Sequence, residues 1–408
     1  MTAPTSPHAF TRLLITSAFV QMADQIALAA LPVTALLVLG AGPGLVGALV
    51  AAQTAAWLIV SLPAGVIVDR LPRRTVLTGA LSVSLVAAMA AALAATAGSV
   101  PLLALAAFLA AAGTVTFVLV QISLVPSLVG PAELPRANAR TELARASAVA
   151  AAPFIVGLLA ERVSPMAGYP LAAAHACGAL IAGTRLALPA AAVPTAAKPP
   201  VLAAIAEGGR FVVRDALLRA IGLCAIFWNF AFIALTAIFV PFALTRLGTD
   251  VAGAGLAIGA AGFGMIAGAV SAPAIFAKVE PRAVLMFGPA SSIVGAVMLL
   301  AAPTFGGLPA AVLAFALIGF GPMLWSVMQT SVRQLVTPPG LMGRVTATIQ
   351  VAVYGVRPLG ALAGGAVGEL FGLDAAMLLV AVAFALSALV SIASPLASLK
   401  AMPQPATA

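Results

Sequence analysis

Residues 75–132 of the chain read TVLTGALSVSLVAAMAAALAATAGSVPLLALAAFLAAAGTVTFVLVQISLVPSLVGPA, and these 58 consecutive positions contain no Asp, Glu, Lys or Arg. A helix that crosses the hydrocarbon core of a bilayer needs about 20 apolar residues, so this run is long enough for two crossings. Ala97-Gly98-Ser99-Val100-Pro101 marks the turn between them. The stretch therefore predicts a pair of membrane-spanning helices.

The same pattern extends over the rest of the chain. Two more uncharged runs, of 44 and 50 residues, cover 25–68 and 283–332, with turn signals at residues 40–44 and 303–307. Single spans are expected in shorter uncharged runs and in apolar stretches that carry an occasional ionisable residue. These are 163–184, 220–245, 251–277 and 375–399, and then Leu13–Leu39, Ala146–Ala160 and Val345–Gly368. We expect an all-α membrane protein with twelve transmembrane helices.

Composition and charge agree with this expectation. The 408 residues are 63% hydrophobic and 8% charged, whereas a soluble globular protein is about 25% charged. With the N-terminus placed inside, 17 of the 20 Lys and Arg residues fall in cytoplasmic segments. This bias follows the positive-inside rule, so both termini are expected in the cytoplasm, at the cell (inner) membrane. The net charge of +9 thus reflects topology, and no nucleic-acid partner is expected.

The chain divides into two halves around a long internal segment. We expect an N-terminal six-helix bundle at residues 1–188, a cytoplasmic linker at 189–217, and a C-terminal six-helix bundle at 218–408. The linker begins as a Pro/Ala-rich stretch, and its second part, Val201–Arg219, has apolar residues at helical spacing. The halves echo each other at an offset of about 205 residues, which is typical of secondary transporters built from repeats.

One motif lies between the expected second and third spans. It reads Gly65-Val66-Ile67-Val68-Asp69-Arg70-Leu71-Pro72-Arg73-Arg74 and resembles the signature loop of the major facilitator superfamily, with Pro72 where that family usually has Gly. The resemblance implies a transporter of two pseudo-symmetric bundles, in which Gly65, Asp69, Arg70, Arg73 and Arg74 form a cytoplasmic gate. A carboxylate at a helix C-terminus is disfavoured by the helix dipole, so Asp69 needs a partner. The alternative is that the arginines only set topology.

A finer resemblance concerns Glu133–Ala139, Gly343-Arg344-Val345 and Pro358-Leu359-Gly360. These segments look like the branch of the superfamily that contains multidrug and siderophore (enterobactin-type) exporters. The fifth span carries Pro153 and Gly157, a degraded form of the family's antiporter motif, and the eleventh carries Pro358 and Gly360. Pro and small residues suit a kinked, moving span, although they also suit close helix contact.

Two ionisable residues fall in the middle of expected spans. Asp24 lies twelve residues after Arg12 and Arg357 thirteen after Arg344, which places both about 20 Å along their helices and near the bilayer midplane. Charges at this depth usually mark a transport pathway. We expect Asp24 to carry a proton, or Arg357 to bind an anionic group of the substrate. The alternatives are a static Asp24–Arg357 pair, or hydrogen bonds from each residue to backbone carbonyl groups.

Uncharged polar residues accompany these charges and are expected to line a substrate cavity. They are Gln21, Gln25, Gln53, Trp57, Gln121, Asn229, Gln329, Gln350 and Tyr354. Gln350, Tyr354 and Arg357 fall at i, i+4 and i+7 on one helix face. For any single Gln, a hydrogen bond between helices is an equally good interpretation.

The segments outside the membrane are too short to form an enzyme. No catalytic residue, metal site or cofactor is expected, and a proton gradient is the expected energy source. The sequence favours a functional monomer that exports amphiphilic small molecules by alternating access. Uptake of a small metabolite, or a non-transporting membrane sensor or partner protein, are the alternatives.

Overall fold

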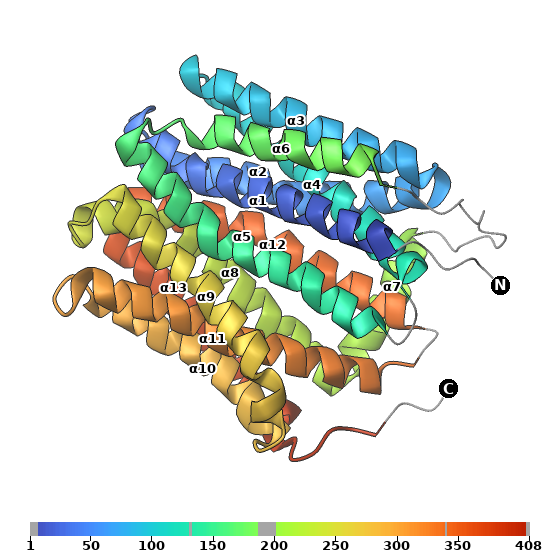
Figure 1. Cartoon of the computed structure of the whole chain (residues 1–408). Coiled ribbons are helices and arrows are strands. Elements are labelled where there is room, and N and C mark those ends of the chain that lie inside the picture. The colour runs from blue at the N-terminus through green and yellow to red at the C-terminus, as the bar shows by residue number, and fades with distance from the viewer. Residues whose placement is uncertain (1–6, 130–132, 187–200, 339–340, 405–408) are drawn as a thin grey trace. The chain divides into compact units, whose positions relative to one another are not determined.

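The computed structural model describes residues 7–129, 133–186, 201–338 and 341–404, without the side chains of residues 7, 8, 69, 134, 135 and 201–205. Over these ranges the regular secondary structure is helical (Figure 1). The first half of the chain forms α1 Pro7–Leu37, α2 Pro43–Arg70, α3 Arg73–Thr96, α4 Val100–Leu128, α5 Leu134–Arg162 and α6 Gly168–Thr184.

A shorter helix and six long helices follow in the second half. They are α7 Val201–Arg214, α8 Ala216–Arg246, α9 Val251–Phe276, α10 Pro281–Ala301, α11 Gly307–Val336, α12 Met342–Phe371 and α13 Leu373–Ile392, followed by the 3-10 turn η3 Pro395–Ser398. Among the described residues, eleven helices are long and apolar enough to cross a membrane. The 17 residues of α6 lie at the lower limit for a span. The expected set of spans is therefore confirmed in outline, with α6 as the shortest.

The turns expected inside the long uncharged runs are where glycine and proline indicated them. Gly98 joins α3 to α4 with φ 65° and Gly40 follows α1 with φ 60°. This left-handed conformation is accessible to glycine because it has no Cβ. Glycine therefore decides where these helices end.

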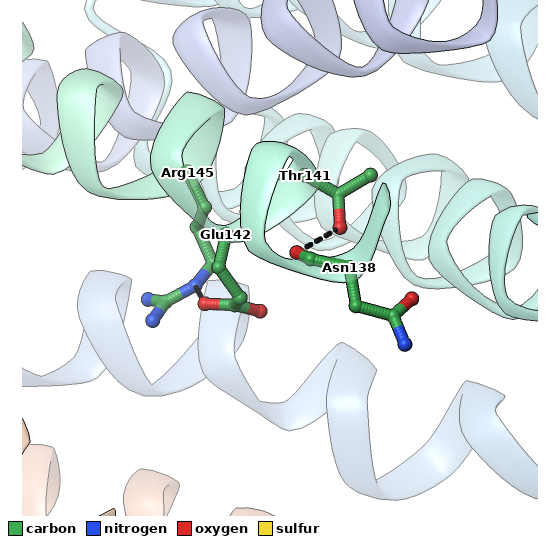
Figure 2. A network of polar contacts seen from close by, with 4 residues as sticks. All are labelled: Asn138, Thr141, Glu142 and Arg145. Atoms are coloured by element: carbon green, nitrogen blue, oxygen red, sulfur yellow. Dashed lines mark hydrogen bonds and ion pairs between the residues drawn. The ribbon is translucent and has the colours of Figure 1, made fainter. Parts of the chain in front are cut away.

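Helix α5 begins earlier than expected. The apolar pattern predicted a span from Ala146, whereas the helix begins at Leu134, twelve residues or about 18 Å before it. Its additional turns expose polar residues (Figure 2): Arg145 Nε lies 2.9 Å from Glu142 Oε2, and Thr141 Oγ1 donates to the carbonyl of Asn138. An ion pair at i and i+3 stabilises a helix that is exposed to water. The helix therefore extends beyond the apolar stretch from which the span was predicted.

Helix α7 ends at Arg214 rather than at the expected Arg219. Asp215 has an extended backbone (φ −80°, ψ 121°), and its Oδ1 accepts a hydrogen bond of 2.8 Å from the amide of Leu218. An Asp in this geometry is an N-cap, so it ends α7 and begins α8. The linker helix and the first span of the second half are thus separated by one residue.

The chain forms two compact units. Unit 1 comprises residues 1–41 and 52–197, and unit 2 comprises 42–51 and 198–408. Residues 42–51 thus group with the second half of the chain. One contact that joins them to it is the 3.1 Å hydrogen bond from the amide of Gly44 to Oε2 of Glu369, a residue of α12. Within unit 2, Phe239 and Phe315 pack edge to face with ring centroids 4.5 Å apart in the hydrophobic core.

Small residues bring helix backbones into contact inside each unit. In unit 2, a Cβ added to Gly264 of α9 would lie 2.1 Å from the carbonyl oxygen of Ala316, and one added to Gly319 of α11 would lie 2.0 Å from that of Ala261. Figure 1 shows α9 and α11 side by side. Only glycine permits such an approach, as is common between helices in membranes.

Candidate functional site

Asp24 lies at the middle of α1, as the sequence predicted. It is the eighteenth residue of this 31-residue helix, and its side chain is partly buried. Gln25 Nε2 donates a hydrogen bond of 3.2 Å to Asp24 Oδ2. Gln21, one turn before, is buried. The carboxylate is therefore hydrogen-bonded to an amide of its own helix.

The other two glutamines expected in unit 1 are buried as well. Gln53 on α2 is 3% exposed and Gln121 on α4 is 8% exposed. The Oε1 atom of each has no hydrogen-bond partner among the described residues. A buried acceptor without a donor is unfavourable by about 1–3 kcal/mol. The two Oε1 atoms are thus suited to accept a hydrogen bond from water or from a bound molecule. Trp57, four residues after Gln53 on α2, is partly buried.

Arg357 has both a hydrogen bond and a cation–π contact in the structure. It is the sixteenth residue of the 30-residue α12 and is partly buried. Its Nε donates to Asn229 Oδ1 over 3.0 Å, and Asn229 Nδ2 donates in turn to the carbonyl of Ala225 over 2.9 Å. The guanidinium carbon lies 4.5 Å from the centroid of the Tyr354 ring. Two helices, α8 and α12, therefore position this cation.

The predicted face of α12 is present, with one difference in environment. Tyr354 is partly buried beside Arg357, whereas Gln350 is exposed. On α11, the Nε2 of Gln329 donates to Ser326 and to Thr330, while its Oε1 is buried without a partner among the described residues. The predicted pairing of Asp24 with Arg357 joins two units and stays a prediction.

The motif between α2 and α3 has a contact that the sequence did not indicate. Arg74 Nη2 donates to the carbonyl of Thr184 over 3.0 Å, at the C-terminus of α6. A cation at this end of a helix is favourable because of the helix dipole. Arg70 is exposed and Arg73 partly buried. The side chain of Asp69 lies outside the described residues, and a Cβ on Gly65 would meet open space among them.

The residues expected to kink spans lie inside uninterrupted helices. Pro153 and Gly157 are buried in α5, and Pro358 lies within α12. Gly360 also permits a close helix contact, since an added Cβ would lie 2.4 Å from the carbonyl oxygen of Phe230 on α8. Close approach of α8 and α12 near Arg357 thus depends on this position.

Charge counting did not separate Arg333 from the other basic residues at helix ends. It lies in the last turn of α11, and its Nε is buried without a hydrogen-bond partner among the described residues. No group of three or more His, Cys, Asp or Glu that could hold a metal occurs in the part of the chain that the structure describes.

The family model for the Major Facilitator Superfamily matches residues 13–361. The chain belongs to the major facilitator superfamily. This superfamily member is therefore a multi-pass membrane transporter and not an enzyme. A comparison with curated protein sequences gives no match.

Solved structures with the same fold transport several kinds of substrate. A variant of the nucleoside transporter NupG has a TM-score of 0.78 at 14% identity, covering 94% of this chain and 98% of that one. A POT family transporter in complex with 5-aminolevulinic acid has a TM-score of 0.76 at 12% identity, covering 95% and 96%. A bacterial homologue of the iron transporter ferroportin has a TM-score of 0.75 at 16% identity, covering 95% and 98%. At such identities the similarity shows the fold of this superfamily member.

Proposed function

We propose that this transporter is a proton-coupled exporter of amphiphilic small molecules, working by alternating access of its two bundles. The observation that carries the proposal is Asp24, a partly buried carboxylate at the middle of α1 that accepts a hydrogen bond from Gln25. Intramembrane acids commonly belong to proton relays. Burial favours the neutral acid and a nearby cation favours the carboxylate, so a change between two environments takes up and releases one proton.

The lining expected around Asp24 suits an amphiphilic substrate. Buried amides of Gln53 and Gln121 provide a few polar contacts in otherwise apolar helices, which is the usual character of a small-molecule site. The export direction rests on the resemblance of residues 133–139 and 343–345 to the multidrug and siderophore branch. The bias of basic residues supports an orientation in the cell membrane with both termini in the cytoplasm, and we propose that the functional unit is a monomer.

Transport by reconstituted protein tests the role of Asp24. Purified full-length protein in liposomes is given a pH gradient, and the movement of ethidium, a lipophilic cation, is followed by fluorescence. We expect Asp24→Asn to abolish the dependence of flux on the gradient, because the amide cannot release a proton. Glu142→Gln, which changes an exposed acid of α5, should keep wild-type flux. Gradient-dependent flux in Asp24→Asn would remove the proposal.

A second candidate is uptake of a small anionic metabolite, which the positioned guanidinium of Arg357 favours. Arg357→Gln should then raise the KM for an anionic substrate by about tenfold or more, since a hydrogen bond to a charged group contributes about 1.5–3 kcal/mol. Reversing the gradient across the same liposomes separates import from export. Equal KM values in Arg357→Gln and wild type would exclude a role of Arg357 in substrate binding.

Asp69 is proposed to belong to a cytoplasmic gate, together with the arginines that follow it. Asp69→Asn should insert into the membrane at wild-type levels, because topology depends on Lys and Arg rather than on Asp. Its transport rate should fall strongly, because the gate loses its carboxylate while its arginines remain. The two measurements are immunoblotting of membranes and flux in liposomes. Full transport by Asp69→Asn would show that the loop serves topology alone.

A further inference from the structure

A groove of about 390 Å³ runs between α1 and α6 within unit 1. Its α1 side is formed by Arg12, Ile15 and Phe19, at i, i+3 and i+7, and its α6 side includes Gly178, Ile181 and Arg185, again at i, i+3 and i+7. Figure 1 shows these two helices side by side. Because positions i, i+3 and i+7 share one helix face, the lining residues of each helix form a stripe, and the groove runs between these two stripes.

The groove is basic at one end and apolar along its length. Arg12 and Arg185 meet at this end, where Arg12 Nη1 donates to the carbonyl of Arg185 over 2.7 Å. No carboxylate forms an ion pair with either arginine among the described residues. Two exposed guanidinium groups without an acid create a site for an anion.

The apolar part of the groove is open to the surroundings. Ile15 is 45% exposed and Ile181 is 48% exposed. At the deep end, Gly178 leaves room for the ring of Phe19, which would lie 2.9 Å from an added Cβ. Both helices are spans or of span length, so these exposed side chains lie at membrane depth. An occupant therefore needs a negative head and an apolar tail.

We propose that this groove binds an anionic phospholipid. The phosphodiester lies against Arg12 and Arg185, and an acyl chain follows Ile15 and Ile181 towards Phe19. Basic pockets between transmembrane helices recognise anionic headgroups in this way. The site lies between α1 and α6 and includes none of the residues proposed for transport.

Binding of individual lipids to the full-length protein in detergent tests the proposal by native mass spectrometry. The probes are phosphatidylglycerol, phosphatidylcholine with the same acyl chains, and soluble glycerol phosphate. We expect preferential binding of phosphatidylglycerol. Arg185→Gln should weaken it about fivefold, the effect of one base near an anionic headgroup, and a double change with Arg12→Gln about twenty-five-fold.

Arg185→Gln is the cleaner variant, because only the backbone carbonyl of Arg185 accepts the bond from Arg12 and this carbonyl is retained. The matched control is Arg140→Gln, which removes an exposed base of α5 and should leave the affinity unchanged. Equal affinity for the two lipids, or equal loss in Arg140→Gln, would overturn the proposal. So would displacement by glycerol phosphate, which would indicate a soluble anion. A gain of affinity after removal of residues 2–6 would mean that the chain itself occupies the groove.

Discussion

At the scale of single residues, the arrangement around Arg357 combines two kinds of contact. The ring of Tyr354 lies below the guanidinium and the amide oxygen of Asn229 accepts from it. A cation over an aromatic ring gains about 0.5–2 kcal/mol, depending on how far it is removed from water. Together the two contacts position the guanidinium between α8 and α12.

Replacing Asn229 tests this arrangement. In Asn229→Ala the Nε of Arg357 loses its acceptor, and we expect a loss of about 1–3 kcal/mol in the free energy of unfolding. Thermal unfolding of the detergent-solubilised protein measures it. Asn138→Ala, at an exposed position of α5 shown in Figure 2, is the matched control and should unfold like wild type. Identical midpoints for the two variants would contradict a supporting role of Asn229.

The sequence could predict part of this site. Arg357, Tyr354 and Gln350 lie on one helix, so their spacing was sufficient to place them on one face. Asn229 is 128 positions away in the chain, and periodicity carries no information about which polar residue of α8 meets α12. The same limit explains why the contact from Arg74 to α6 was missed, since it spans 110 positions.

At the scale of helices, hydrophobic length located the spans and missed some helix ends. Uncharged runs and glycine turns were sufficient for α3 and α4. The start of α5 was missed because a polar helix outside the bilayer has no apolar signal. Helix α7 contacts α12: Glu207 forms an ion pair with Arg344, and a Cβ on Gly208 would lie 2.5 Å from the carbonyl oxygen of Arg344. Gly208 therefore allows α7 to lie against α12.

Glycine contacts between helices also lead to a stability prediction. In Gly319→Ala the new methyl meets the backbone of Ala261 at 2.0 Å, which neither helix can avoid without moving, so we expect a loss of about 1–3 kcal/mol. Gly79 on α3 has open space around it among the described residues. Gly79→Ala should therefore be neutral or slightly stabilising. Thermal unfolding compares the two, and a lower midpoint for Gly79→Ala than for Gly319→Ala would contradict this account.

At the scale of the whole molecule, the distribution of charge predicts which side each turn faces. Ala97→Cys, in the exposed turn after α3, should react with a membrane-impermeant maleimide in intact cells, whereas Arg140→Cys, on the polar start of α5, should react only after lysis. A background with Cys177→Ser removes the exposed native thiol. Labelling of Arg140→Cys in intact cells would reverse the proposed orientation.

The shortness of α6 has a consequence for the membrane around it. Its 17 residues rise about 25 Å, against a hydrocarbon thickness of about 30 Å. A short span is accommodated by local thinning of the bilayer or by flanking side chains that reach the interface, and this hydrophobic mismatch is unfavourable by a fraction of a kcal/mol per ångström. Arg12 and Arg74 donate hydrogen bonds to the carbonyl groups of Arg185 and Thr184 at the C-terminal end of α6. Lipids with shorter acyl chains should therefore suit this transporter better than lipids with longer ones.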